Sequence, residues 1–421
     1  MTAFLDARAD ELPERIDTEV CVIGAGAAGI TLARELAANG RKVLLVESGG
    51  EKIEAQTQSL YVAPNSGVPY YDLAACRLRY FGGTTNHWSG YCGPNNPIDY
   101  EGRPELNLPP WPINHETLAP YIAKAAELLE INTHFFDPTE QLRSKNLDPS
   151  DLIENSSDAL VTRVAQISRN IRLGPRFRQE IADSPNIQPI EYLNATEIIL
   201  DGQGNVDHIR AATLGGKRTN IHAHAFILCC HGIENARLLL ESDSQVKGGI
   251  GNRYDHVGRY FMEHPFIYAS RMIPSENFPM VYDRAFLARR SINANLMFSD
   301  KTMREQGLLS YYCRFNPVYR EKDTERARNR LPKRLMEPAS LALYHDLKAV
   351  MSDWAGIRNS VSRKFLGEQL PVYYQLEHRI EQVPNPDSRV TLGTRRNKLG
   401  QREVDFHWEL SDHEFKTFNV G

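Results

Sequence analysis

The sequence predicts an α/β fold, α+β over the whole chain, with one domain built on a mostly parallel sheet and a second on an antiparallel sheet. Three observations favour this. A glycine-rich turn joins a buried strand to a helix between residues 18 and 50. Short strands separated by turns fill residues 186–230. From residue 266 onwards, segments rich in Tyr, Phe and β-branched residues are typical of an antiparallel sheet. With 421 residues, the chain is also long for one hydrophobic core.

The first strong motif is a strand, a glycine turn, a helix and a second strand that ends in an acidic residue. Its parts are the strand Glu19–Ile23, the glycines Gly24, Gly26 and Gly29 in the spacing G-x-G-x-x-G, the helix 27–38, the strand 42–46 and Glu47. The first glycine allows a tight turn, the second lets the backbone approach a pyrophosphate, and the third lets the helix pack closely on the strand. The helix N-terminus offers N–H groups to phosphates, and the acid can hydrogen-bond ribose. The pattern predicts a Rossmann-like dinucleotide-binding domain. Its predicted cofactor-binding residues are the three glycines, Glu47 and Ser48, which follows the acid.

The motif by itself fits either FAD or NAD. Its position near residue 20 of a long chain favours FAD, because flavin domains often open a chain in this way. An NAD-dependent dehydrogenase is kept as an alternative.

The stretch RLRYFGGTTNHWSGYCGP, residues 77–94, combines glycines with short polar side chains and suits a flat flavin ring. Paired glycines let backbone lie against a cofactor without Cβ clashes. A tryptophan can cover a ring face, and an arginine can meet a phosphate with a fork of donors. The alternative is a glycine-rich surface loop with a buried Trp anchor. The predicted cofactor-binding residues here are Arg79, Gly82, Gly83, Thr84, Asn86, His87, Trp88, Ser89 and Gly90.

Five segments, in order, resemble the glucose–methanol–choline (GMC) oxidoreductases. They are the fingerprint from Thr18, RLRYFGGTTNHWSG at 77–90, CCHGIENARLLLES at 229–242, VGRYFMEHP at 257–265 and EQVPNPDSRVTLG at 381–393, while WPINHETLAPYIAKAAELL at 111–129 resembles bacterial members. The resemblance implies FAD as cofactor and oxidation of an alcohol or a similar C–H donor. It also implies an FAD-binding domain over residues 1–265, which is discontinuous and lacks its final segment, and a substrate-binding domain over 266–421, which is incomplete at its C-terminus. The FAD-binding domain includes a β-meander, in which Ala195 gives a backbone contact to adenine.

Two histidines have a special place in this resemblance. Some relatives with a similar THW triplet carry the flavin covalently on the histidine. The triplet here is NHW, so we expect His87 near the isoalloxazine and keep the covalent bond as an open alternative. His231 stands where relatives usually carry a small residue, so its imidazole can either contact the cofactor or face solvent.

The catalytic base is not assigned. In relatives it comes from a His-His or His-Asn pair well after the PDSRV motif, whereas His407 and His413 follow that motif too closely and fit the strand and linker before the pair. The resemblance therefore implies that the family's C-terminal end is missing. The chain would then be a fragment, or one half of a split enzyme whose active site a second polypeptide completes. A non-catalytic flavin-binding or partner-chain GMC fold is the other alternative. Among the histidines present, His264 and His378 are the first candidates to test.

Composition excludes several classes of protein. The formal net charge of −4 gives no reason to expect a nucleic-acid partner. No segment approaches the roughly 20 apolar residues of a membrane span. The six cysteines lack zinc spacing, so reduced thiols in a cytoplasmic protein are the simplest interpretation.

The basic stretch 320–365 is predicted to form solvated helices. The expected substrate of the protein is a small molecule.

Overall fold

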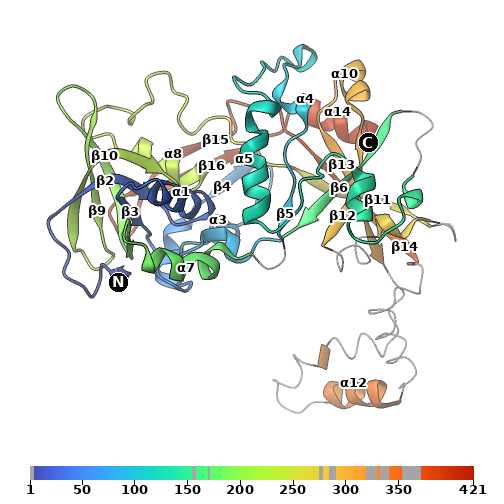
Figure 1. Ribbon diagram of the computed structural model, residues 1–421, viewed down its shortest axis with the longest axis horizontal. Helices are drawn as coiled ribbons and strands as arrows, with labels where there is room; N and C mark the ends of the chain where they lie inside the picture. Colours follow the sequence, from blue (N-terminus) through green and yellow to red (C-terminus); the bar gives the residue numbers. More distant parts are fainter. Residues whose placement is uncertain are drawn as a thin grey trace. The chain divides into compact units, whose positions relative to one another are not determined.

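The computed structural model describes residues 4–153, 158–168, 171–274, 278–283, 291–318, 330–331, 341–352 and 371–421 (Figure 1). The chain forms two compact units. Unit 1 contains Met1–Gly90, Arg169–Glu263 and Gln382–Phe415, and unit 2 contains Tyr91–Ser168, His264–Glu381 and Lys416–Gly421. One boundary between the units lies between Glu263 and His264. Both units are discontinuous, because strands distant in the sequence pair within each of them.

Unit 1 is built on a seven-stranded sheet in the order β1-β7-β3-β2-β10-β9-β8, of which Figure 1 labels β2, β3, β9 and β10. The strands are β1 (Leu5–Asp6), β2 (Arg15–Ile23), β3 (Val43–Val46), β7 (Ile187–Glu191), β8 (Asn194–Leu200), β9 (Val206–Ala212) and β10 (Arg218–Leu228). The first five strands in that order are parallel, and β9 and β8 continue antiparallel as the predicted β-meander. All four residues of β3 are buried, as expected of a strand in a parallel sheet that is covered on both faces.

The glycine turn leads from β2 into α1 (Ala27–Ala38), which has the bounds that the sequence predicts. The helix ends at Asn39, and Gly40 follows with φ 78°. The left-handed φ after the helix is the usual glycine stop. The other helices of unit 1 are α2 (Ala55–Gln58), α3 (Leu73–Cys76), α7 (Leu173–Asp183), α8 (Gly232–Glu241) and the 3-10 turns Ser59–Tyr61 and Gly83–Asn86.

A second, three-stranded sheet of unit 1 has the order β15-β16-β4. Its strands are β15 (Arg389–Arg396), β16 (Arg402–Trp408) and β4 (Asn65–Gly67). Val390, Phe406 and Trp408 pack there against Ile233 of α8 and Leu73 of α3. This hydrophobic cluster holds α8 in place, and the position of α8 matters for the site described below.

Unit 2 is built on a six-stranded sheet in the order β11-β14-β13-β12-β6-β5, and every pairing between its described strands is antiparallel. The strands are β5 (Tyr91–Cys92), β6 (Leu160–Ile167), β11 (Phe266–Met272), β12 (Ile292–Phe298), β13 (Tyr311–Val318) and β14 (Tyr373–Ile380). Tyr282, Phe315 and Tyr374 lie in its core. The predicted fold class, a Rossmann-like domain with a β-meander plus an antiparallel-sheet domain, is confirmed.

The remaining described helices include α5 (His115–Leu128), which is longer than α1. They are α4 (Pro97–Tyr100), α5 (His115–Leu128), α6 (Pro138–Arg143), α10 (Asp300–Gln306), α12 (Leu341–Ser352), α14 (Asp412–Val420) and the 3-10 turns Pro104–Leu106, Pro149–Asp151 and Met280–Tyr282. Apart from α12 and residues 330–331, the basic stretch 320–365 lies outside the described residues. Over the described ranges, the structure contains no helix with the length and apolar character that crossing a membrane requires.

Candidate dinucleotide site

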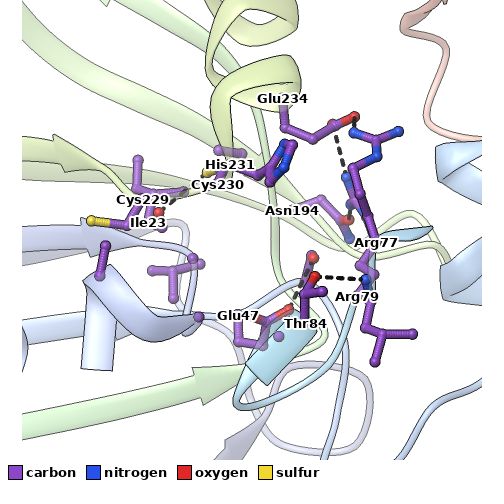
Figure 2. A pocket seen from close by; sticks show the side chains of 18 of the residues that line it. Ile23, Glu47, Arg77, Arg79, Thr84, Asn194, Cys229, Cys230, His231 and Glu234 are labelled. Carbon is purple, nitrogen blue, oxygen red and sulfur yellow. Dashed lines mark hydrogen bonds and ion pairs between the residues drawn. The ribbon is translucent and has the colours of Figure 1, made fainter. Parts of the chain in front are cut away.

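A cavity of about 270 Å³ opens in unit 1 where β2, β3 and β10 end (Figure 2). Its wall includes the last residues of β2 and β3, the first turn of α1 and the first residues of α8. In open α/β sheets, ligands bind at the carboxyl ends of the parallel strands. The cavity therefore occupies the place where a dinucleotide is expected.

The three glycines of the motif differ in what surrounds them. A Cβ on Gly24 would lie 2.5 Å from the carbonyl oxygen of Cys229, and one on Gly29 would lie 1.8 Å from the carbonyl oxygen of Gly24. No atom lies within 4 Å of the position that a Cβ on Gly26 would take. Gly24 and Gly29 are thus required for packing of the chain on itself, whereas Gly26 faces open space beside the cavity.

Glu47 is 6% exposed and is held by neighbouring donors. One carboxylate oxygen accepts from the backbone N–H of Ala25 at 2.9 Å, and the other accepts from the N–H of Gly49 at 2.9 Å and from the Ser48 hydroxyl at 3.1 Å. These bonds join the end of β3 to the glycine turn. Each carboxylate oxygen has two lone pairs, so Glu47 keeps the capacity to accept from ribose hydroxyls.

Three arginines pair with Glu234 of α8, and Figure 2 labels Arg77, Arg79 and Glu234 among them. Arg77 Nη1 lies 3.2 Å and Arg79 Nη2 3.0 Å from its carboxylate oxygens, and Arg237 Nε lies 2.8 Å away. All four side chains are buried. Burial by itself would raise the pKa of Glu234, but the attraction of Arg237, Arg79 and Arg77 outweighs it and lowers the pKa to about 2. Three cations against one anion leave this wall of the cavity positive.

Two guanidinium nitrogens in this wall are buried without a hydrogen-bond partner, Arg79 Nε and Arg237 Nη1. The sequence predicts that the two terminal nitrogens of Arg79 bind a phosphate. In the structure they donate to protein groups instead, Nη1 to Asn194 Oδ1 at 2.9 Å and Nη2 to the Glu234 carboxylate. A buried donor left unpaired costs free energy, which a bound acceptor recovers. The site therefore suits an anionic ligand rich in acceptor oxygens.

The stretch 77–94 divides into residues that reach the cavity and residues that shape the turn. Gly83, Thr84 and Thr85 line the cavity. Gly82 has φ 95° and packs on Gly174, where a Cβ would come within 2.6 Å of backbone atoms. This tight turn is the reason that the sequence is glycine-rich here.

The polar side chains after this turn are used locally. Asn86 donates to the carbonyl oxygen of Phe81 at 2.8 Å, and Trp88 Nε1 donates to the carbonyl oxygen of Ile171 at 3.0 Å. His87 is exposed. Of the predicted cofactor contacts, the cavity is lined by Gly24, Gly26, Glu47, Ser48, Arg79, Gly83, Thr84 and Ala195, and it is not lined by Gly29, Gly82, Asn86, His87, Trp88, Ser89 or Gly90. Which of them contact FAD stays a prediction.

Sequence reasoning missed Arg77, Asn194, Glu234 and Arg237. The available signal was the pair Glu234 and Arg237, which are three residues apart in the first turns of α8. Such an i, i+3 pair usually lies on a solvated helix face. Here, both side chains are buried, because they meet arginines from a distant segment.

His378 lies in unit 2 on β14. Its Nδ1 is 2.7 Å from the Tyr311 hydroxyl, and its Nε2 is 2.8 Å from the Ser270 hydroxyl. Burial lowers its pKa. Both ring nitrogens are therefore already hydrogen-bonded within the sheet, which makes His378 a poor base in this arrangement.

The other candidate histidines are spread over the chain. His264 is exposed. His407 lies on β16, the strand predicted for it, while His413 lies in α14 rather than in a linker. The geometry assigns none of them as a catalytic base.

Comparisons with known proteins agree with this fold. A family model described as "FAD dependent oxidoreductase" (DAO) matches residues 19–385. Pyridoxine 4-oxidase from Mesorbium loti is 13% identical, with a TM-score of 0.50 over 96% of this chain and 77% of that one. Formate oxidase gives a TM-score of 0.49 at 17% identity, over 94% of this chain and 78% of that one, and the R554K formate oxidase of Aspergillus oryzae gives 0.47. No curated protein matches.

At 13% identity, the likeness to pyridoxine 4-oxidase supports the fold alone. The family match covers most of the chain and includes the glycine turn, Glu47, the arginine cluster and α8. The protein therefore belongs to the FAD-dependent oxidoreductase family, with FAD as its cofactor.

Proposed function

We propose that this protein is a GMC-type flavoenzyme that oxidises an alcohol-like small molecule by hydride transfer. The observation that carries the proposal is the buried, positively charged cavity at the glycine turn, in a chain with five GMC-like segments.

The residues present fit the ADP half of FAD. Gly26 and the first turn of α1 would receive the diphosphate, Glu47 and Ser48 would bind the ribose, and the backbone at Ala195 would contact adenine. Arg79 Nε and Arg237 Nη1 supply donors for which the described part of the chain provides no acceptor. This match of donors to an anionic dinucleotide supports the proposal.

Bound FAD supplies the hydride acceptor, flavin N5, for oxidation of an alcohol carbon. The contribution of this chain is to hold and screen the cofactor. The α1 N-terminus and the excess positive charge around Glu234 balance the diphosphate charge in a site of low dielectric, where such attraction is strong. Because the arginines are already fixed by Glu234 and Asn194, little reorganisation is needed on binding.

The first experiment is mass spectrometry of the purified protein under native and denaturing conditions, together with its visible absorbance spectrum. We expect one FAD per chain and a yellow protein. A colourless protein that binds a nicotinamide dinucleotide would contradict the proposal. FAD without turnover of any alcohol would favour the non-catalytic alternative.

Alcohol turnover by the purified chain is expected to be slow, because we identify no residue that would take the hydroxyl proton of the alcohol. His378, one candidate, is hydrogen-bonded at both ring nitrogens. Loss of general-base catalysis typically lowers a rate about 10²–10⁴-fold. Anaerobic bleaching of the flavin by a panel of alcohols measures this. Acceleration by a second polypeptide that carries a His-His or His-Asn pair would support the predicted partner. Rapid bleaching by the chain alone would contradict it, and His264→Ala and His378→Phe would then identify the base.

Acid precipitation is expected to release the flavin into the supernatant. His87 is exposed and does not line the cavity, although the sequence places it near the isoalloxazine. Flavin that stays with the precipitated wild type but is released from His87→Ala would show covalent attachment. Peptide mapping by mass spectrometry provides the check.

A further inference from the structure

His231 has a backbone conformation that side chains rarely adopt. Its φ is 79° and its ψ is 151°, in a region populated almost only by glycine. The residue stands between the end of β10 and the first residue of α8, where it is the N-cap of the helix. Strain of this kind occurs preferentially at ligand sites.

The imidazole is held in one orientation. Nδ1 accepts a hydrogen bond from the N–H of Ile233 at 3.3 Å, which caps the first turn of α8. Because Nδ1 is the acceptor, the neutral ring carries its proton on Nε2. Burial and the charge of Arg77 lower the pKa of His231, which favours the neutral ring.

The side chain lies between two cavities. It lines the dinucleotide cavity with Gly26, Glu47 and Arg77 (Figure 2), and it also lines a second cavity of about 410 Å³ formed with Tyr70 and Met262. A glycine at this position would relieve the backbone strain, but it would leave neither a cap for α8 nor a donor at this wall.

We propose that His231 is a cofactor-binding residue that donates a hydrogen bond from Nε2 to the ADP half of FAD. The inference rests on the proposed site for FAD in this cavity. In this proposal, the hydrogen bond from His231 to the bound dinucleotide offsets the free-energy cost of the strained His231 backbone.

The test compares wild type with His231→Gly in two measurements. The first is thermal unfolding of the flavin-free proteins, and the second is the affinity for FAD and for ADP alone by fluorescence titration and calorimetry. We expect His231→Gly to unfold at a temperature no lower than that of wild type, yet to bind both ligands at least about tenfold more weakly. His231→Asn, which can cap α8 but reaches less far, should lose affinity in the same direction.

The outcomes separate the two proposals. If wild type binds FAD and the glycine variant binds it equally well or more tightly, the imidazole makes no useful contact and the assignment of His231 is wrong. If FAD affinity falls but ADP affinity does not, the contact is not to the ADP half, and the assignment is equally overturned. Failure of wild type to bind FAD would refute the proposed function itself.

A separate cluster lies on the β-meander and lines neither of these two cavities. Asp207 and His208 of β9 and His222 of β10 place one possible ligand atom each within 4.8 Å of one another. The imidazole centroids are 5.0 Å apart, and His208 Nδ1 is 2.7 Å from the Asp207 carboxylate. The two histidine side chains are only 15% and 20% exposed. The paired strands β9 and β10 thus hold the rings close together.

The geometry also points to a site here for a divalent transition metal such as Zn²⁺, which would link β9 to β10. Two imidazoles and one carboxylate suit zinc and its neighbours, whereas Mg²⁺ prefers oxygen ligands alone. This inference is independent of FAD.

Calorimetric titration of the flavin-loaded protein, first treated with a chelator, with ZnCl₂ and with MgCl₂ tests the metal site. We expect saturable binding of Zn²⁺ and none of Mg²⁺, with His208→Ala and His222→Ala each at least about tenfold weaker. His224→Ala is the matched control, since it lies two residues further along β10 and outside the cluster. Absence of Zn²⁺ binding, or binding that depends on His224 and not on His208, would overturn the site.

Discussion

Replacing Gly26 with valine is expected to give a folded protein that purifies without FAD. Gly26 has φ −82° and ψ −164°, an extended conformation that valine also adopts, and no atom lies within 4 Å of the added Cβ. The valine methyls would instead occupy the space that the diphosphate needs. We expect FAD affinity to fall at least about 100-fold, measured by flavin content and by titration of the flavin-free protein.

Two controls make this result specific. Gly26→Ala adds one carbon in the same place and should give a smaller loss of affinity. Gly29→Val should instead prevent folding, because its Cβ would lie 1.8 Å from the Gly24 carbonyl oxygen. Wild-type flavin content in Gly26→Val would rule out the proposed place of the diphosphate.

Glu234→Gln is expected to cause the largest loss of stability. Glu234 is the shared anion of Arg77, Arg79 and Arg237, and all four side chains are buried. Without it, three buried cations lose their counter-charge. Breaking a buried ion pair by removing one partner typically costs about 3–5 kcal/mol. Urea unfolding of the flavin-free protein measures the change in the free energy of unfolding.

The matched control is Glu180→Gln. Glu180 pairs with Arg34 at 2.6 Å, but its side chain is 51% exposed. An exposed pair contributes about 0–1 kcal/mol, so this variant should unfold almost as wild type does. If Glu234→Gln costs no more than this control, the cluster around Glu234 does not stabilise the fold as its geometry indicates.

The pH dependence of unfolding provides a second measurement on Glu234. Its folded pKa of about 2 lies below the ordinary value of 4.5. The carboxylate therefore contributes its full stabilisation above pH 4.5, and this is lost progressively as the pH falls towards about 2. Wild type should lose stability over this range, and Glu234→Gln should lose less, because it has no carboxyl there to protonate. An equal loss in both would exclude Glu234 as the titrating group.

The sequence by itself determined the local parts of the dinucleotide fold. The helix Ala27–Ala38, the strand that ends at Val46 and the turns of the β-meander were all predicted correctly. These features depend on contacts close in the sequence: a run of buried residues, a glycine that allows a positive φ, and a helix stop at Asn39 and Gly40. How the segments are shared between the two units is a long-range property, because each unit joins strands that are distant in the sequence.

Only the tertiary structure decided how the polar residues of the site are used. Arg77 and Arg79 lie 157 and 155 residues from Glu234, so nothing in the local pattern shows that they share one carboxylate. The same holds for His231, whose φ of 79° follows from how β10 and α8 are packed. Burial and charge partners are long-range properties. A sequence pattern can name an arginine as a phosphate ligand, but only the fold shows which of its nitrogens is left for the ligand.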